Sequence, residues 1–232
     1  MQEYNVVINV DSSFFTYAKR IVRNLIAKNS DLVKLNISLN KRMLENDYFY
    51  AINEISKNNN GDEVFNITIS SITPLKLLKS VLAIELFKAL LYFCNPAVKA
   101  FRRRAGEIFY NKSNDIVERV VYAKLVDTVE NCAVAIIKPW ISEGFLNIYL
   151  DEEVYDTPLD YMLSQAMIAP LYATGLVQPQ LDLDNLEPLT LLLSTYSVEI
   201  VENPAEKTGL TLADELYSLA KIIINDYDAE LS

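Results

Sequence analysis

The spacing of apolar residues changes along this chain of 232 residues, and that change limits its fold more than any motif does. In 33–40 every second side chain is apolar, which is the period of a strand with one buried face. From Thr73 onward the apolar residues instead recur every three or four positions, which is the period of a helix. The pattern therefore predicts strands near the beginning of the chain and helices after them.

The first seventy residues predict a small β-α-β-α-β unit. Its strands could pair in parallel through right-handed crossovers. We expect strands at 3–10, 33–40 and 65–69, and helices at 14–28 and 44–55.

The later residues predict long helices, because proline follows a capping residue at both Thr73-Pro74 and Asn95-Pro96. A third helix would end before Pro139. The remaining elements that we expect are a short strand at 145–150, a helix at 157–170, a loop at 203–209 and a last helix capped by Thr211, while 191–201 fits a helix or a strand.

The expected fold class is α/β or α+β, rich in helix, with the β-α-β-α-β element packed with a layer of longer helices. The spacing of apolar residues and the charge divide the chain into three regions: 1–72 as the small α/β element, 73–139 as a helical core, and 140–232 as a mixed acidic region. We expect them to form one integrated domain rather than three.

Missing residue types exclude several kinds of chemistry. The chain has no histidine, so imidazole-based catalytic triads and histidine-containing zinc sites cannot be built. Its five glycines stand singly, and no phosphate-binding glycine loop is present. Cys94 and Cys132 are expected to be buried thiols in a reducing compartment, with a disulfide between them as the alternative. We therefore expect no cofactor and no metal.

The sequence also predicts a protein that is neither secreted nor inserted in a membrane. Met1 opens directly into a strand-like segment, without a basic region and an apolar core. The longest apolar run, 75–94, contains Lys76, Lys79 and Glu85, which fit a core helix better than a membrane span. The expected location is the cytoplasm, or a virion assembled there.

Charge is distributed unevenly along the chain. Residues 1–112 hold 16 Lys plus Arg and 10 Asp plus Glu, a net charge of +6, whereas 113–232 hold 5 and 21, a net charge of −16. If the halves occupy different parts of the surface, this asymmetry favours head-to-tail association of copies. The alternative is that the two halves interleave and neutralise each other within the fold.

Two basic clusters are candidate binding sites for an anionic partner. The alternative is a solvated surface in which Arg103 pairs with Glu107, four residues away. The candidate residues are Lys19, Arg20 and Arg23 on the first helix, and Lys99, Arg102 and Arg103 on the helix after Asn95-Pro96.

Two acidic clusters have the oxygen ligands that a hard metal ion prefers, although solvated acidic surface is the simpler interpretation. The clusters are Asp151, Glu152, Glu153 and Asp156, and Asp182, Asp184 and Glu187.

These observations favour a non-enzymatic structural or assembly subunit of a homo-oligomer, in a ring or shell, with a viral or phage virion as one setting. Its partners would be itself and other assembly subunits. One alternative is a nucleic-acid-associated module that uses the basic half. The other is a carboxylate-metal enzyme that acts on a phosphate or sugar-nucleotide substrate through Asp182 and Asp184.

Overall fold

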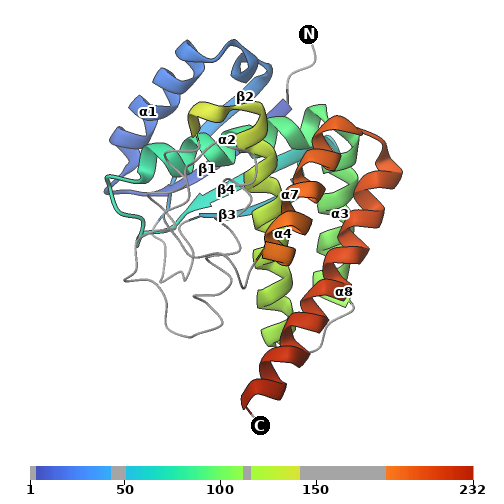
Figure 1. Cartoon of the computed structure of the whole chain (residues 1–232). Helices are drawn as coiled ribbons and strands as arrows, with labels where there is room; N and C mark the ends of the chain where they lie inside the picture. Colours follow the sequence, from blue (N-terminus) through green and yellow to red (C-terminus); the bar gives the residue numbers. More distant parts are fainter. Residues whose placement is uncertain (1–3, 43–50, 112–115, 142–186, 232) are drawn as a thin grey trace. The chain divides into compact units, whose positions relative to one another are not determined.

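A computed structural model describes residues 4–42, 51–111, 116–141 and 187–231. These residues form a four-stranded mixed sheet and six α-helices, which confirms a helix-rich α+β fold. The chain divides into two compact units, Met1–Phe93 and Cys94–Ser232 (Figure 1). The division falls at Phe93, whereas the regions expected from the sequence were divided at residues 72 and 139.

The first unit is built on a sheet with the strand order β2-β1-β4-β3. β1 runs parallel to both β2 and β4, and β3 runs antiparallel to β4. The strands are β1 (Tyr4–Asp11), β2 (Leu35–Arg42), β3 (Ala51–Lys57) and β4 (Glu63–Ile69).

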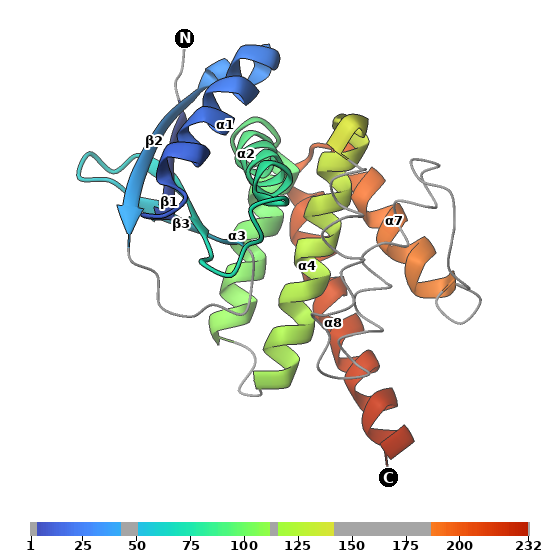
Figure 2. The ribbon, with the colours of Figure 1, turned by 90° about the vertical axis from the view of Figure 1, so that its left-hand side faces the viewer.

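One face of this sheet is apolar and is covered by two helices. In register, Val6 of β1 lies between Ile37 of β2 and Phe65 of β4, so these side chains share a face. Helix α1 (Phe15–Lys28) packs over β1 and β2, and α2 (Leu78–Cys94) contacts β4, where the Tyr92 ring lies 5.7 Å from that of Phe65. Figure 2 shows both helices on the same side of the sheet.

The opposite face of the sheet is polar and rich in asparagine. Asn36 donates a hydrogen bond to Oδ1 of Asn5 across the β2–β1 pair at 3.1 Å. On the other half of the sheet, Asn66 donates to Oγ of Ser56 at 2.8 Å. The alternation of apolar and polar residues in the sequence thus separates a helix-covered face from a face with cross-strand hydrogen bonds.

The predicted helix at 44–55 is wrong over residues 51–55, which lie in β3, and its first part, 44–50, lies outside the described residues. The turn that was expected to end this helix instead closes a hairpin between β3 and β4, because Asn58 Oδ1 accepts the amide hydrogens of Asn60 and Asp62. Gly61 supplies the left-handed conformation at φ +86°. Pairing with β4 overrode the helical spacing of five residues, Leu44, Tyr48, Ala51, Ile52 and Ile55.

Helix α2 is buried around its whole circumference between Val81 and Tyr92. It therefore encloses two charged side chains, Glu85 and Lys88, which form an ion pair at 3.0 Å. Asn53 of β3 also donates a hydrogen bond to the Glu85 carboxylate. The pairing satisfies charges that would otherwise be costly to bury.

The described residues of the second unit form helices. α3 packs along α8, and α4 packs against α7 and α8. The described helices of this unit are α3 (Pro96–Asn111), α4 (Ile116–Ile137), α7 (Glu187–Glu202) and α8 (Glu206–Leu231). The described part of the chain also contains short 3-10 helices at Ser30–Lys34 and Pro139–Ile141.

The start of α3 is fixed as the sequence predicted. Asn95 Oδ1 accepts the amide hydrogens of Ala97 and Val98 at 2.9 and 3.1 Å, so Asn95 caps the helix. Its side-chain amide donates to the carbonyl oxygen of Ile200, which ties the cap to α7.

The last helix begins earlier than expected, at Glu206 rather than after a loop that ends at Gly209. Gly209 lies inside α8, where a side chain would overlap the carbonyl oxygen of Ala97 in α3. This glycine therefore permits close packing of two helices and does not mark a break. The ambiguous segment 191–201 is helical within α7.

Candidate functional site

The cations predicted on the first helix lie on the exposed side of α1. Lys19 and Arg23 are one helical turn apart and share a face. Arg20 points to a different part of the surface, where its guanidinium lies 4.9 Å from the centre of the Tyr17 ring. The predicted trio is therefore divided between two directions.

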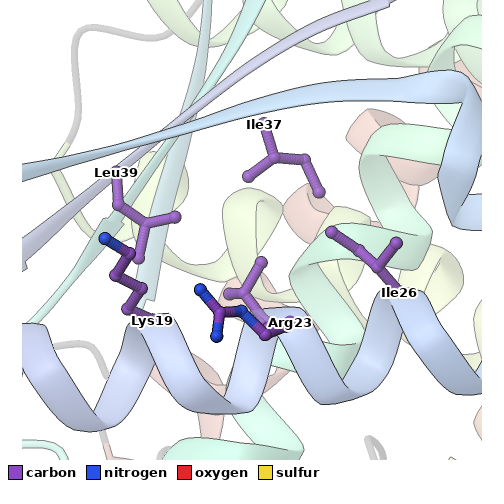
Figure 3. Close-up of a pocket in the computed structure, with 6 residues that line it drawn as sticks. Lys19, Arg23, Ile26, Ile37 and Leu39 are labelled. Carbon is purple, nitrogen blue, oxygen red and sulfur yellow. The ribbon is translucent and has the colours of Figure 1, made fainter.

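Lys19 and Arg23 border a groove of about 250 Å³ between α1 and β2. The α1–β2 groove is formed by these two cations and by four apolar residues. Figure 3 shows Lys19, Arg23 and Ile26 extending from α1 toward β2, and Ile37 and Leu39 extending from β2 toward α1. The apolar residues are Val22, Ile26, Ile37 and Leu39.

Within the described part of the chain, the positive charges of Lys19 and Arg23 at the α1–β2 groove are not neutralised by ion pairs. Among the residues that the structure describes, neither Lys19 nor Arg23 has an ion-pair partner. Two like charges four positions apart on a helix also repel each other by about 0.2–0.5 kcal/mol. The groove thus combines an apolar floor with a positive rim, which suits an occupant that has an apolar side chain beside carboxylates.

The cations predicted on α3 are in a different situation. Arg102 forms an ion pair with Glu130 of α4, whose side chain is only 4% exposed. Arg103 is exposed, and Lys99 is half-buried. Arg102 is therefore used inside the helical unit. The two predicted clusters belong to different units, α1 to the first and α3 to the second.

The third arginine of the run also has partners within its own unit. Arg104 donates through Nε and Nη2 to the Asp214 carboxylate of α8, and through Nη1 to Glu107 at 3.0 Å. These hydrogen bonds raise the pKa of Arg104, Asp214 first and Glu107 second. Glu107, the expected partner of Arg103, is thus paired with Arg104.

These ion pairs change the interpretation of the charge asymmetry. Divided at the boundary between the units, Met1–Phe93 holds 11 Lys plus Arg and 9 Asp plus Glu, a net charge of +2, and Cys94–Ser232 holds 10 and 22, a net charge of −12. The arginines of α3 thus belong to the acidic unit and neutralise part of it. The charge asymmetry persists between the two units. The net charge of the first unit, +2, is however smaller than the +6 obtained when the chain is divided at residue 112.

A second surface feature, not identified from the sequence, lies where α3 ends and α4 begins. Large apolar side chains are exposed there: Tyr110 is 70% exposed and Ile116 is 76% exposed. Lys221 lies 3.9 Å from Glu118, which brings α8 beside the first turn of α4. We call this surface the apolar end of the helical unit, and it comprises Tyr110, Ile116, Val117 and Val120.

The cysteines differ in their environment. Cys132 is a buried thiol, as expected, but Cys94 is exposed, so the prediction that both are buried is wrong. Cys94 is the last residue of α2, and a helix end leaves its side chain at the surface. The two residues form no disulfide.

The acidic clusters that begin at Asp151 and Asp182 lie outside the described residues, except that Glu187 begins α7. Within 4–42, 51–111, 116–141 and 187–231, no three Cys, Asp or Glu side chains are arranged to hold a metal ion. In the same ranges no single helix is long and apolar enough to cross a membrane, and only α2 and α3 together, as a bent pair, meet that test by length and composition.

No family model, no curated protein and no solved structure matches this chain.

The sequence could have indicated both surfaces in part. The spacing of Lys19 and Arg23 placed two cations on one face of a helix, but the apolar floor depends on how α1 packs over β2. Ile116, Val117 and Val120 do share one side of a helix. An apolar stripe of this kind usually faces the core, so only its exposure in the fold identifies it as a surface.

Proposed function

We propose that this chain is a non-enzymatic assembly subunit that associates with further copies of itself into a ring or a shell. The observation that carries the proposal is the apolar end of the helical unit, where four large apolar side chains are at least 39% exposed. Clustered apolar side chains on a surface are typical of sites where proteins associate.

Charge supports the same function. The two units carry net charges of +2 and −12, so contact between unlike units of two copies is electrostatically favoured over contact between like units. Contacts between unlike surfaces are heterologous, and they either close into rings or propagate. A virion as the setting stays a prediction from the sequence.

The first test removes the apolar end. We expect the wild-type chain to show species larger than a monomer in native mass spectrometry, with a population that rises with concentration. Ile116→Asp combined with Val120→Asp should shift that population to monomer and weaken association by at least about tenfold, because each substitution places a carboxylate in an apolar contact.

The matched control is Val33→Asp combined with Leu75→Asp, since both residues are 53% exposed apolar side chains of the first unit. This variant should assemble as the wild-type chain does. A wild-type chain that stays monomeric at every concentration would contradict the proposed function, and equal loss of assembly in both variants would contradict the role of the apolar end.

A further inference from the structure

We propose that the α1–β2 groove binds an extended acidic segment of a partner protein, which adds to the sheet as a strand beside β2. This inference goes beyond the proposed function, because it assigns a partner other than a second copy of this chain. Three features of the described residues carry it: the open edge of the sheet at β2, the apolar floor of the groove and the two cations on its rim.

The edge of the sheet at β2 offers backbone groups to an added strand. Among the described residues, β2 is the first strand in the order β2-β1-β4-β3 and pairs on one side only, with β1. The amides and carbonyls of an edge strand that point away from its neighbour have no partner in the sheet. A peptide that lies along β2 would form main-chain hydrogen bonds with these groups, which is a common way for a sheet edge to bind an extended peptide.

The apolar floor of the groove lies at this open edge. Ile37 and Leu39 of β2 pair in register with Val6 and Ile8 of the central strand β1, which are fully buried. Ile37 and Leu39 themselves are only half-buried. Figure 3 shows both side chains extending toward α1, on the side from which Ile26 approaches. An apolar side chain of an added strand would bury the surface that they still expose.

The spacing of the two cations fits carboxylates on a strand. Lys19 and Arg23 are four positions apart on α1, which separates them by about 6 Å along the helix axis. Residues on one side of a strand are two positions apart, or about 7 Å along its length. Acidic residues at alternate positions of an added strand would therefore each reach one cation. Neither cation has an ion-pair partner among the described residues, so both are available for charge-assisted hydrogen bonds.

The charges of the edge strands disfavour a second copy of this sheet as the occupant. Residues 33–42 contain three cations, Lys34, Lys41 and Arg42, and no acidic residue. In an antiparallel pair of two β2 strands, the Lys34 end of one copy would meet the basic end of the other, and like charges opposite each other destabilise a sheet. The other edge strand, β3, has one acidic residue, Glu54, which lies on the polar face because its neighbour Asn53 reaches α2. An acidic partner strand meets neither difficulty.

The composition of the groove favours a peptide over a nucleic acid. Of the six residues that the structure describes along it, four are apolar and none is aromatic. Phosphates would contact the two cations without using the apolar floor, and unpaired bases bind mainly by stacking on aromatic rings. A strand with both acidic and apolar side chains uses the floor, the cations and the backbone edge together.

The test uses a heptapeptide probe with this pattern, acetyl-Val-Thr-Glu-Thr-Glu-Thr-Val-amide. On a strand its valines and glutamates share one side, and its sequence reads the same in both directions, so parallel and antiparallel addition are tested together. We expect saturable binding to the full chain in calorimetric titration at low salt, weakened by added salt. The control peptide, acetyl-Val-Glu-Thr-Thr-Glu-Thr-Val-amide, places its glutamates on opposite sides and should bind at least about tenfold more weakly.

The groove variant is Lys19→Glu with Arg23→Glu. It should bind the probe at least about tenfold more weakly than the wild-type chain, because carboxylates then face carboxylates. The matched control is Arg20→Glu with Lys79→Glu, which changes the net charge of the first unit equally at exposed cations outside the groove and should bind as the wild-type chain does. Equal loss in both variants would show that the probe responds to net charge alone, and it would overturn the inference.

N-methylation of the probe tests the addition of a strand. Alternate amides of an added strand point toward β2, so N-methylation of one alternate set should weaken binding at least about tenfold and N-methylation of the other set should leave it nearly unchanged. Equal effects of the two methylations, or a wild-type chain that does not bind the probe, would overturn the inference. Tighter binding of an eight-residue oligothymidylate, lost in the groove variant, would assign the surface to nucleic acid and overturn it too. The oligomeric state of the apolar-end variants tests the proposed function separately from all these results.

Discussion

Two tyrosine hydroxyls in the second unit join pairs of helices. The Tyr122 hydroxyl of α4 donates a hydrogen bond to the carbonyl oxygen of Ala213 in α8 at 3.1 Å. Burial raises the pKa of Tyr122, and the nearby Asp214 carboxylate raises it further, so the hydroxyl stays a donor. Tyr196 of α7 behaves alike: burial and a hydrogen bond to Glu215 raise its pKa to about 12. These two tyrosines thus contribute to packing between helices.

Removing the Tyr122 hydroxyl tests this role. Tyr122→Phe should lower the free energy of unfolding by about 1 kcal/mol, because one buried hydrogen bond between α4 and α8 is lost while the ring is kept. Urea denaturation measures the change. Tyr110→Phe is the matched control, because Tyr110 is 70% exposed, and it should change stability by less than about 0.5 kcal/mol. Equal effects of the two substitutions would show that the hydrogen bond to Ala213 contributes nothing.

At the scale of the element, two predictions from local sequence patterns were wrong because contacts with another element determined the structure. The segment 51–57 has a helical spacing of apolar residues, yet it forms the edge strand β3 because β4 offers a complete set of backbone partners. Gly209 is typical of a helix end, yet it lies within α8 because α3 approaches there closely. Both depend on residues outside the segment itself, which a local pattern does not contain.

The close approach of α3 and α8 can be tested at its glycine. Gly209→Ala should lower the free energy of unfolding by about 1–3 kcal/mol, because the new methyl group would overlap the Ala97 carbonyl and lie 2.7 Å from the Phe101 amide nitrogen.

Gly106 provides the matched control, since it also lies within a helix but a Cβ there would meet nothing within 4 Å. Gly106→Ala should raise the free energy of unfolding by about 0.5–1 kcal/mol, the usual gain in a helix interior. Thermal or chemical denaturation of both variants gives the comparison. A Gly209→Ala protein as stable as the wild type would refute the close contact.

At the scale of the whole molecule, charge is organised by units and not by halves of the sequence. The ion pairs Arg102–Glu130 and Arg104–Asp214 lie within Cys94–Ser232 and join α3 to α4 and to α8. The basic run of α3 therefore stabilises the acidic unit instead of forming an independent basic surface. Lys19 and Arg23 remain the part of the predicted anion site that faces a groove.

This organisation predicts a local effect of one substitution. Arg102→Ala should destabilise the second unit by about 3 kcal/mol, because the Glu130 carboxylate, 4% exposed, loses a cationic partner. In hydrogen exchange, amides of α3, α4 and α8 should exchange faster, while those of β1 to β4 keep their rates.

Arg103→Ala is the control at an exposed neighbouring residue and should leave exchange nearly unchanged. Faster exchange in both units of Arg102→Ala would show that Met1–Phe93 and Cys94–Ser232 unfold as one body.

The sequence by itself determined the elements whose signals are local. Alternation along β1, β2 and β4, the apolar stripe of α1 and the Asn95 cap of α3 all follow from neighbouring residues, because strand and helix periods act over a few positions. The class of fold followed from them.

Only the tertiary structure decided how those elements combine. It made a strand of Ala51–Lys57, placed Gly209 inside a helix and paired Arg102 with Glu130 across 28 positions of sequence. It also gave Lys19 and Arg23 an apolar floor and exposed the apolar end of the helical unit. These features depend on which surfaces meet, since burial, pairing and exposure are properties of contacts between distant segments.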